Sequence, residues 1–158
     1  MTRRQLFGLL SALGVSAPKA EAASSPSRPD AVVLSDAQWR ERLSPMAYAV
    51  LREEATERAG TSALNAEKRR GRFLCAGCDL PLFASEAKYE SGTGWPSFFE
   101  PLPGALGTKT DFKLLLPRTE YHCARCGGHH GHVFDDGPRP TGQRWCNNGA
   151  ALKFEVAA

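Results

Sequence analysis

Two CxxC pairs constrain this chain more than any other feature of its 158 residues. One pair is Cys75 with Cys78, and the other is Cys123 with Cys126. Each pair lets one tight turn present two thiolates, and two such turns supply the four sulfur ligands of a closed tetrahedral zinc site. Residues 79–122 separate the pairs, a longer spacer than the roughly 15–20 residues of common zinc ribbons. A fold built on this site must therefore bring two distant hairpin turns together.

The same spacing is compatible with two other uses of the cysteines, a local disulfide within each CxxC or a pair of redox-active dithiols. His129 and His132 follow the second pair and compete as zinc ligands. We favour one structural zinc ion per chain, held by Cys75, Cys78, Cys123 and Cys126, because four thiolates complete the tetrahedron. Such an ion would join two parts of a sheet and would take no part in chemistry.

The fifth cysteine, Cys146, has no partner in this arrangement. It lies in the segment Gln-Arg-Trp-Cys-Asn-Asn-Gly, residues 143–149. Reactive cysteines are thiolates activated by cationic neighbours, and Arg144 is such a neighbour. Cys146 is therefore a candidate nucleophile.

Three histidines occur within four residues, at positions 129, 130 and 132. A single histidine in such a polar turn would be read as structural. The cluster, together with a free thiol elsewhere in the chain, favours a functional role. On a strand, His129 and His132 converge only if Gly131 kinks the backbone.

Trp95 stands between Gly94 and Pro96 in the segment Ser-Gly-Thr-Gly-Trp-Pro-Ser-Phe. An aromatic residue in a tight turn is commonly part of the core. In an enzyme the same residue would form a rigid wall for a small apolar group, since methyl groups and sulfur pack well on indole.

The N-terminal segment predicts export. Arg3 and Arg4 form a twin-arginine pattern ahead of an apolar run over residues 6–15, which is too short to span a membrane. Residues 20–22, Ala-Glu-Ala, match a cleavage site. We expect a twin-arginine signal peptide over residues 1–22 and a periplasmic location; an uncleaved amphipathic start is the alternative.

The rest of the chain divides into an expected disordered linker, residues 23–33, and one domain, residues 34–158. The formal net charge of +3 falls to +1 without the signal, because Arg3, Arg4 and Lys19 leave together with Glu21. This balance predicts no nucleic-acid partner. We also expect a monomer with no stable membrane association after signal removal.

The fold class expected is mainly β (α+β), with antiparallel sheets, a short helical N-terminal arm and the zinc site joining the two CxxC turns. Helix-capping signals predict helices that begin after Ser35 and Ser44, the second ending at Gly60. Alternating apolar residues predict strands on either side of each CxxC turn. The expected strands cover residues 73–75, 80–83, 110–116, 120–123 and 150–156.

Four segments, CAGC, SGTGWPSF, HHGHVFDDGP and QRWCNNGAALKF, occur in this order. Together they resemble the methionine-R-sulfoxide reductases, the B-type methionine sulfoxide reductases, from about residue 35 to residue 156. The resemblance implies a peptide-methionine (R)-S-oxide reductase that repairs oxidised proteins under oxidative stress. It implies that Cys146 attacks the sulfoxide sulfur and becomes a sulfenic acid.

The resemblance also assigns the substrate pocket. Trp95 would receive the ε-methyl group of the substrate, while His129, His132 and Asn148 would bind and protonate its oxygen. Arg144 would lower the pKa of Cys146. Held by distinct groups, the chiral sulfur would be accepted in its R form alone.

The chain departs from the family pattern at three positions. Many members have a resolving cysteine where this chain has Thr93, so recycling would need an external reductant, such as a thioredoxin-like thiol, or the loss of a zinc ligand. His130 replaces a usual Leu and Asn147 a frequent Ile, changes expected to widen or wet the pocket. Two rival interpretations remain: a non-enzymatic zinc-ribbon module that binds a partner protein, and a dithiol–disulfide exchanger that uses the CxxC pairs.

Overall fold

The computed structural model describes residues 28–158. The expected signal peptide lies outside these residues, as does the first part of the expected linker. In the described part, Asp30 accepts a hydrogen bond from Arg125 at 2.9 Å and the Val32 amide donates to the Arg125 carbonyl at 2.9 Å. Residues 30–32 therefore contact the second CxxC turn. No helix within residues 28–158 has the length and apolar character needed to cross a membrane.

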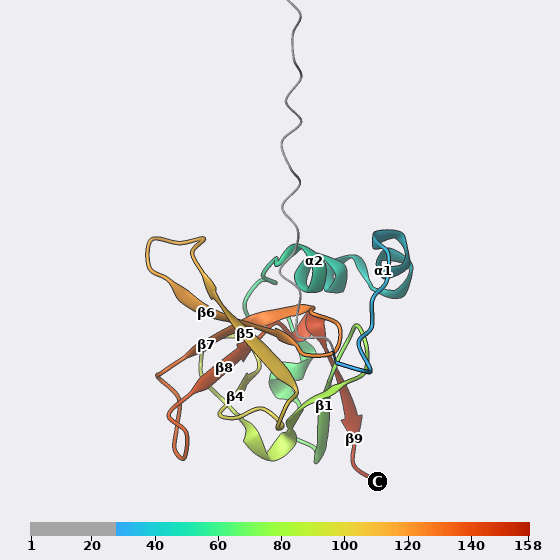
Figure 1. Cartoon of the computed structure of the whole chain (residues 1–158). Helices are drawn as coiled ribbons and strands as arrows, with labels where there is room; N and C mark the ends of the chain where they lie inside the picture. The colour runs from blue at the N-terminus through green and yellow to red at the C-terminus, as the bar shows by residue number, and fades with distance from the viewer. Residues whose placement is uncertain (1–27) are drawn as a thin grey trace, which may run out of the picture.

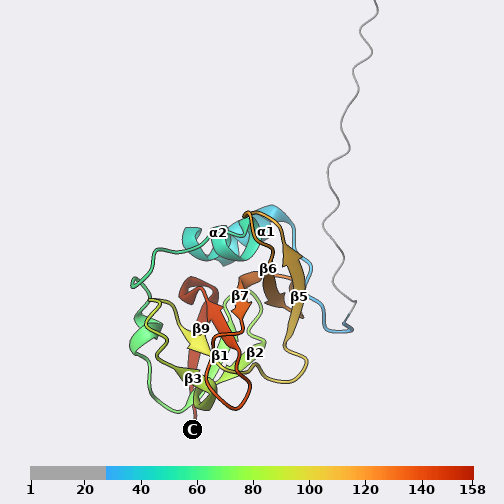
Figure 2. The same cartoon turned by 90° about the vertical axis from the view of Figure 1, so that its left-hand side faces the viewer.

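Two short helices form the N-terminal arm, α1 (Asp36–Arg42) and α2 (Pro45–Glu53). Ser35 caps α1 in a capping box with Gln38, and Ser44 caps α2. Both caps satisfy amides that would otherwise lack a partner at a helix N-terminus. The predicted starting points are confirmed, and both helices lie at one end of the molecule, beside the sheets (Figures 1 and 2).

The predicted end of the second helix at Gly60 is wrong. Glu54 adopts the left-handed conformation, with φ of 56°, and the Ala55 amide bonds back to the Ala49 carbonyl. The Glu54 carboxylate also pairs with Lys109 and Lys113. These tertiary contacts end α2 at Glu53, although residues 54–59 contain no helix-breaking residue.

Two antiparallel sheets contain all the strands of the described residues. The smaller has the order β2-β1-β9 and the larger the order β3-β4-β8-β7-β6-β5. The strands are β1 (Gly71–Cys75), β2 (Pro81–Ala84), β3 (Lys88–Tyr89), β4 (Ser97–Phe98), β5 (Leu106–Asp111), β6 (Arg118–Cys123), β7 (His129–Phe134), β8 (Arg144–Asn147) and β9 (Leu152–Val156). Short 3-10 helices are η1 (Ala63–Ala66), η2 (Ser85–Ala87) and η3 (Gly149–Ala151). The expected fold class is confirmed.

The strands expected around the first CxxC turn are confirmed as β1 and β2, and the last as β9. The strand expected over residues 110–116 is wrong: β5 ends at Asp111, and a turn over residues 112–117 follows it. The second CxxC turn accordingly joins β6 to β7. The apolar residues of this turn are exposed, so their hydrophobicity does not mark a buried strand.

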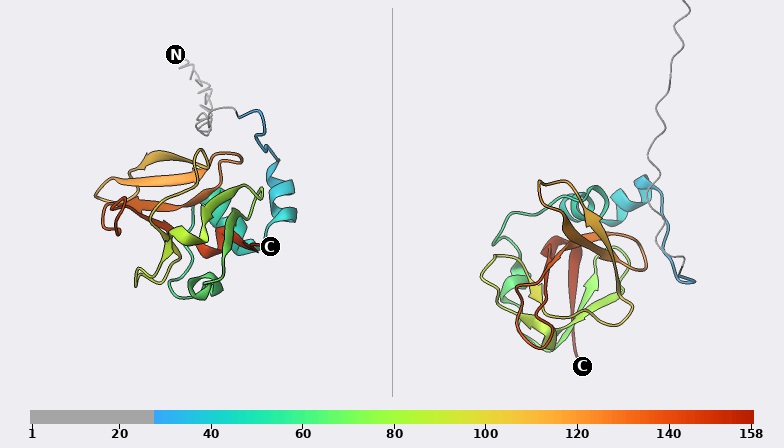
Figure 3. Two further views of the ribbon diagram at one scale, coloured as in Figure 1. Left: turned by 90° about the horizontal axis from the view of Figure 1, so that it is seen from below. Right: turned by 60° about the vertical axis from the view of Figure 1, so that its left-hand side comes forward.

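A cluster of aromatic rings joins the two sheets. Phe98 of β4 stacks on Phe83 of β2 with ring centroids 4.1 Å apart, and its edge meets Phe73 of β1 at 4.9 Å. All three are completely buried. Seen from below, β5–β8 lie on one side of the molecule and β1 with β2 on the other (Figure 3). The shared core fixes the strand that carries Cys146 relative to the CxxC turns.

Candidate active site and metal centre

The four paired cysteines converge on one point. Their sulfur atoms lie within 4.8 Å of one another and all four residues are buried. Cys75 and Cys126 approach to 3.6 Å and Cys78 and Cys123 to 3.5 Å, so the nearest neighbours belong to different CxxC turns. Tetrahedral thiolates around zinc at ~2.3 Å stand about 3.8 Å apart. The donor set and its spacing fit a zinc ion, and none of the cysteines forms a disulfide.

The two CxxC turns share one backbone pattern. The amides of Asp79 and Gly127 each donate at 2.9 Å to the carbonyl of the first cysteine of their turn, Cys75 and Cys123 respectively. Gly127 has a positive φ of 68°, but in the first turn Asp79 takes this conformation, with φ of 60°. Gly77 has no positive φ, so a non-glycine residue takes the left-handed conformation in the first turn.

Strand register places Cys146 beside His132. On the larger sheet, His132 pairs with Glu120 on one side and with Cys146 on the other, and Ser97 pairs with Cys146 beyond that. Directly paired residues share a face of the sheet. Ser97, Cys146, His132 and Glu120 thus form one row across β4, β8, β7 and β6.

An irregularity in β7 brings His129 to the same face as His132. The pairing with β6 shifts between Tyr121 and His122, so that His130 is the extra residue. The rings of His129 and His132 lie 5.6 Å apart. The predicted convergence is confirmed. Gly131 is needed for close strand approach, since a Cβ there would lie 1.9 Å from the Cys146 carbonyl oxygen.

A cavity of about 130 Å³ opens at Cys146. Four of the residues predicted for the site line it: Trp95, His132, Cys146 and Asn148. Its other walls are Thr56, Arg118, Gly131, Phe134 and Asn147. His129 and Arg144, also predicted for the site, do not line it. The cavity therefore combines a thiol, an indole, an imidazole, an amide and a guanidinium.

Glu57 holds two walls of the cavity in place. Its carbonyl accepts the Trp95 indole N–H at 3.1 Å, and its amide donates to the Asn148 side-chain oxygen at 3.0 Å. Its buried carboxylate accepts the amides of Gly149 and Ala150 at the start of η3. Because one residue makes all these bonds, Trp95 and Asn148 have fixed relative positions.

His132 is oriented by a carboxylate. Its Nε2 lies 2.7 Å from Asp111 Oδ2, an oxygen that also accepts from Arg118 at 2.8 Å. The pKa of Asp111 is held well below its usual range, first by the Lys113 amide and then by His132 and Arg118, against the effect of burial. An ionised carboxylate only accepts, so His132 carries a proton on Nε2. Burial lowers the pKa of His132, while Asp111 opposes this shift.

His129 contacts a different carboxylate. Its Nδ1 lies 2.7 Å from Glu120 Oε1, and His122 Nδ1 lies 3.2 Å from the other oxygen. Burial raises the pKa of Glu120, but the two histidines outweigh burial and lower the value to about 2. His129 is itself buried. It lies beside the His132 ring but is not among the residues that line the cavity.

The expectation that the pKa of Cys146 is lowered is wrong for the site as it stands. Burial raises the pKa of this thiol above its usual value, while Arg144 and a hydrogen bond with Thr93 act in the opposite direction. The direction predicted for Arg144 is thus correct, but burial outweighs it. Arg144 is held by two hydrogen bonds to Asp136, at 2.7 and 2.8 Å, and lies over the Phe134 ring.

His130 and Asn147, the two polar departures from the family pattern, are buried, and most of their polar atoms have hydrogen-bond partners. His130 faces the metal centre, with Nε2 3.4 Å from the Cys75 sulfur, so it does not wet the cavity as expected. Asn147 accepts from the Tyr121 hydroxyl at 2.9 Å and donates to the Asn148 carbonyl at 2.7 Å. Both side chains are fully buried, and burial lowers the pKa of His130 to about 3. His130 therefore acts within the core, whereas Asn147 also forms part of the cavity wall.

Sequence reasoning missed Asp111, Arg118, Glu120 and Glu57. None of them belongs to a short motif, and each reaches the site through strand register or a loop contact. The segment around Glu120, Arg-Thr-Glu-Tyr-His-Cys, is polar, so nothing in the sequence indicates that this carboxylate is buried.

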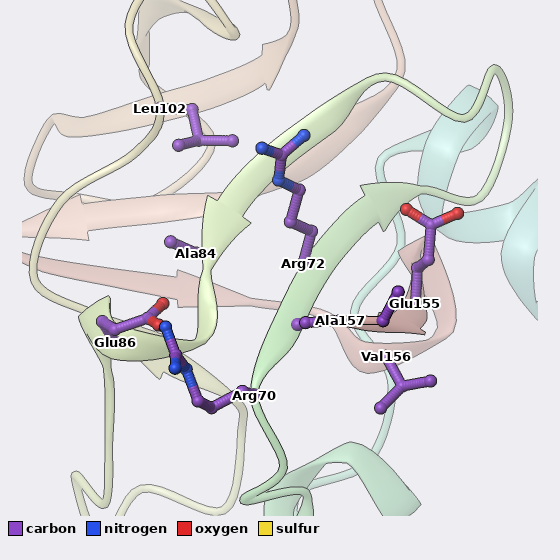
Figure 4. A pocket seen from close by; sticks show the side chains of 10 residues that line it. Arg70, Arg72, Ala84, Glu86, Leu102, Glu155, Val156 and Ala157 are labelled. Carbon is purple, nitrogen blue, oxygen red and sulfur yellow. The ribbon is translucent and has the colours of Figure 1, made fainter.

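A larger hollow of about 650 Å³ lies on the smaller sheet, near the C-terminus (Figure 4). Arg70, Arg72, Glu86 and Glu155 line it, with Arg70 paired to Glu86 at 3.4 Å. It contains no cysteine or histidine. Size alone thus does not identify the candidate site, whereas the reactive groups at Cys146 do.

Comparison with known proteins agrees with these observations. The SelR domain model matches residues 43–156. The peptide methionine sulfoxide reductase MsrB of Agrobacterium fabrum is 52% identical over 122 residues, covering 77% of this chain and 90% of that protein. The MsrB of Leptospira interrogans is 49% identical over 122 residues, with 77% and 93% covered. The chloroplastic peptide methionine sulfoxide reductase B1 of Arabidopsis thaliana is 45% identical over 142 residues, with 89% and 70% covered. The chain belongs to the SelR-domain family of B-type peptide methionine sulfoxide reductases.

Proposed function

We propose that this protein reduces the R epimer of methionine sulfoxide, chiefly in oxidised proteins, with Cys146 as the nucleophile. One observation carries the proposal. Four of the five cysteines form the buried cluster, and the fifth opens into a cavity with Trp95, His132 and Asn148. A metal-binding interaction module or a CxxC dithiol exchanger would need no such cavity.

The reaction transfers one oxygen atom and two electrons. Cys146 sulfur attacks the sulfoxide sulfur and forms a transient S–S bond. The protonated oxygen then moves to the Cys146 sulfur as the sulfoxide S–O bond and the S–S bond break, which leaves methionine and a Cys146 sulfenic acid. The thiol begins protonated because burial raises its pKa. Its proton balances the step, since it ends on the sulfenic oxygen. No other net proton is required.

We infer that His132 relays that proton. It lies across the strand pair from Cys146 and has its Nε2–H bonded to Asp111, so its Nδ1 lone pair is the site that accepts a proton. The imidazolium formed is stabilised by the Asp111 carboxylate and can then donate to the sulfoxide oxygen. Arg118 and the Asn148 amide supply further positive charge and hydrogen bonding toward that oxygen.

Selection of one epimer follows from the same walls. The sulfur would lie beside Cys146, with its methyl group on Trp95, its oxygen toward His132 and Asn148, and its Cγ methylene leading out of the cavity. The three substituents of the sulfur thus have distinct positions. The opposite epimer would place its polar oxygen against the indole and leave its hydrogen-bonding partners unpaired. Unpaired buried polar groups are costly, so discrimination should be strong.

Recycling is proposed to use an external thiol, such as a thioredoxin-like protein. Thr93 occupies the position next to Cys146, and the other four cysteines are committed to the cluster. One external thiol converts the sulfenic acid to a mixed disulfide with release of water. A second thiol then restores Cys146 and leaves as the oxidised disulfide. The zinc ion, held by Cys75, Cys78, Cys123 and Cys126, supplies structural cross-linking when bound.

We also propose export through the twin-arginine route, which rests on the sequence of residues 1–22 alone. Replacing Arg3 and Arg4 by lysine should keep the chain in the cytoplasm of a host that has this route. Unchanged periplasmic recovery of the lysine variant would contradict the proposal.

The function is tested with Cys146→Ser and the separate epimers of N-acetyl-methionine sulfoxide, with dithiothreitol as reductant. The wild-type protein should consume the R epimer alone, and the variant should lose at least ~10³-fold in turnover while keeping its metal. Retained activity in the variant, or equal consumption of both epimers, would contradict the proposal. Without reductant, each chain should yield one methionine and a Cys146 sulfenic acid that dimedone traps.

A further inference from the structure

The turn between β5 and β6 carries a concentrated group of exposed apolar side chains. Within residues 28–158, seven large hydrophobic side chains are exposed, and four of them belong to this turn: Phe112, Leu114, Leu115 and Leu116. We call residues 112–117 the apolar turn; it projects from the upper left of the molecule in Figure 1. Contiguous exposed apolar side chains mark interaction surfaces, whereas single ones do not.

The apolar turn is attached directly to the rim of the Cys146 cavity. At its start, Asp111 accepts the Lys113 amide at 2.9 Å; at its end, Arg118 donates to the same carboxylate at 2.8 Å. The third partner of Asp111 is His132, and both Arg118 and His132 line the cavity. One carboxylate therefore fixes the base of the turn relative to the reacting groups.

The charges near the turn favour a polypeptide over a lipid surface. Lys113 is the one charged residue in the turn, and its ammonium pairs with Glu54, as does that of Lys109. Binding to anionic lipid requires basic side chains that are free to meet the headgroups. The Glu54 carboxylate contacts both ammonium groups and offsets one of their two charges, so a single net positive charge lies beside four exposed apolar side chains.

The cavity is too small to bind more than the end of one side chain. Its volume of about 130 Å³ is well below the roughly 300–1,000 Å³ of pockets that enclose a whole small-molecule ligand. When the substrate is an oxidised protein, the residues flanking the methionine sulfoxide must therefore lie outside the cavity, across its rim. The apolar turn adjoins that rim, because it begins after Asp111 and ends before Arg118 of the cavity wall.

We propose that the apolar turn binds apolar side chains that flank methionine sulfoxide in extended, unfolded polypeptides. The inference rests on the proposed function. Buried methionines have apolar neighbours, and these become accessible together when a protein unfolds. The turn would therefore direct the enzyme to damaged, unfolded proteins, in preference to free methionine sulfoxide and to exposed sites on folded ones.

The test uses the triple variant Leu114→Ser, Leu115→Ser, Leu116→Ser in the full-length, metal-loaded protein. Each of the three side chains is exposed, so the fold should persist. The substrates are two peptides, with methionine-R-sulfoxide flanked by leucines in one and by serines in the other, and N-acetyl-methionine-R-sulfoxide. Val156→Ser is the matched control, because Val156 is exposed but lies on β9 of the other sheet.

We expect kcat/KM for the leucine peptide to fall about tenfold in the triple variant, mainly through KM. Values for the serine peptide and the small substrate should stay within about twofold, as should all values for Val156→Ser. Equal losses on all three substrates, or none on the leucine peptide, would overturn the inference. The inference would also be overturned if the wild type bound anionic vesicles, the triple variant did not, and the two had the same peptide kinetics. If the wild type reduces no substrate, the proposed function itself is wrong.

Discussion

Arg144 and burial act in opposite directions on the Cys146 thiol. The guanidinium favours the thiolate both by its charge and by a hydrogen bond, whereas desolvation disfavours it and dominates. A resting thiol that is mainly protonated resists nonspecific oxidation and alkylation, yet carries the proton that the sulfoxide oxygen needs. The position of Arg144 outside the cavity indicates that it adjusts the thiol and does not bind substrate.

Replacing Arg144 by glutamine should raise the pKa of Cys146 further. The attraction of the guanidinium is lost, and Asp136, which already disfavours the thiolate, loses its partner. At any pH below the pKa, the thiolate fraction falls tenfold for each unit of increase. At about pH 8, Cys146 of the variant should therefore react more slowly with iodoacetamide than Cys146 of the wild type. The midpoint of the curve of alkylation rate against pH should move to higher pH.

The measurement is the alkylation rate of Cys146 in metal-loaded protein, followed by mass spectrometry over a range of pH. Arg72→Gln provides the control, since Arg72 is exposed on β1 of the smaller sheet. An unchanged or lower midpoint in Arg144→Gln would show that Arg144 does not favour the thiolate.

At the scale of elements, a helix or strand boundary was predictable from the sequence where contacts within the same turn determine it. Ser35 and Ser44 predicted the starts of the two helices, because an N-cap side chain bonds to backbone amides within the same turn. The end of α2 was not predictable from the sequence, because Glu54 contacts residues that are distant in the chain. They are Lys109 of β5 and Lys113 of the turn after β5. Likewise the leucines at 114–116 read as a strand, although no buried face receives them.

The residues of the candidate site likewise divide into those that the sequence predicted and those that it did not. Cys146, Trp95, His132 and Asn148 were found because they belong to recognisable segments. Asp111, Glu120 and Arg118 were missed because they reach the site through the register of β5, β6 and β7, which pattern and spacing do not specify. The pairing of His129 with Glu120 was missed for the same reason, since it is visible only in the folded sheet.

A buried hydrogen bond ties β8 to β6 across β7. Tyr121 pairs with Gly131, which pairs with Asn147, and the glycine leaves room for the Tyr121 hydroxyl to reach Asn147 Oδ1. Both side chains are fully buried. Removing one partner leaves a buried polar group without a hydrogen bond, whereas removing both replaces the pair by apolar contacts.

A double-mutant cycle should therefore show coupling between these positions. Asn147→Ile and Tyr121→Phe should each lower the free energy of unfolding by about 1–3 kcal/mol. The double variant should lose less than the sum, with a coupling of about 1 kcal/mol. Denaturant unfolding of the four metal-loaded proteins measures this, and strict additivity would show that the bond does not stabilise the sheet.

At the scale of the whole molecule, the cysteine cluster connects the two sheets and the helical arm. The first CxxC turn belongs to the smaller sheet and the second to the larger. Arg52 of α2 donates to the Cys126 carbonyl at 3.0 Å, and Arg125 donates to the Cys78 carbonyl at 3.2 Å. The helical arm and both sheets thus meet at the cysteine cluster.

Removal of the metal should therefore unfold the domain as a unit. Structural zinc contributes roughly 10–16 kcal/mol in small zinc domains, as much as or more than the roughly 5–15 kcal/mol stability of a typical domain. We expect one zinc per chain, loss of the cooperative thermal transition in Cys123→Ser, and the same loss after chelation of the wild-type protein. Cys146→Ser should keep both its zinc and its transition temperature, because Cys146 lies outside the cluster. A metal-free wild type that unfolds cooperatively at an unchanged temperature would show that the aromatic core alone joins the sheets.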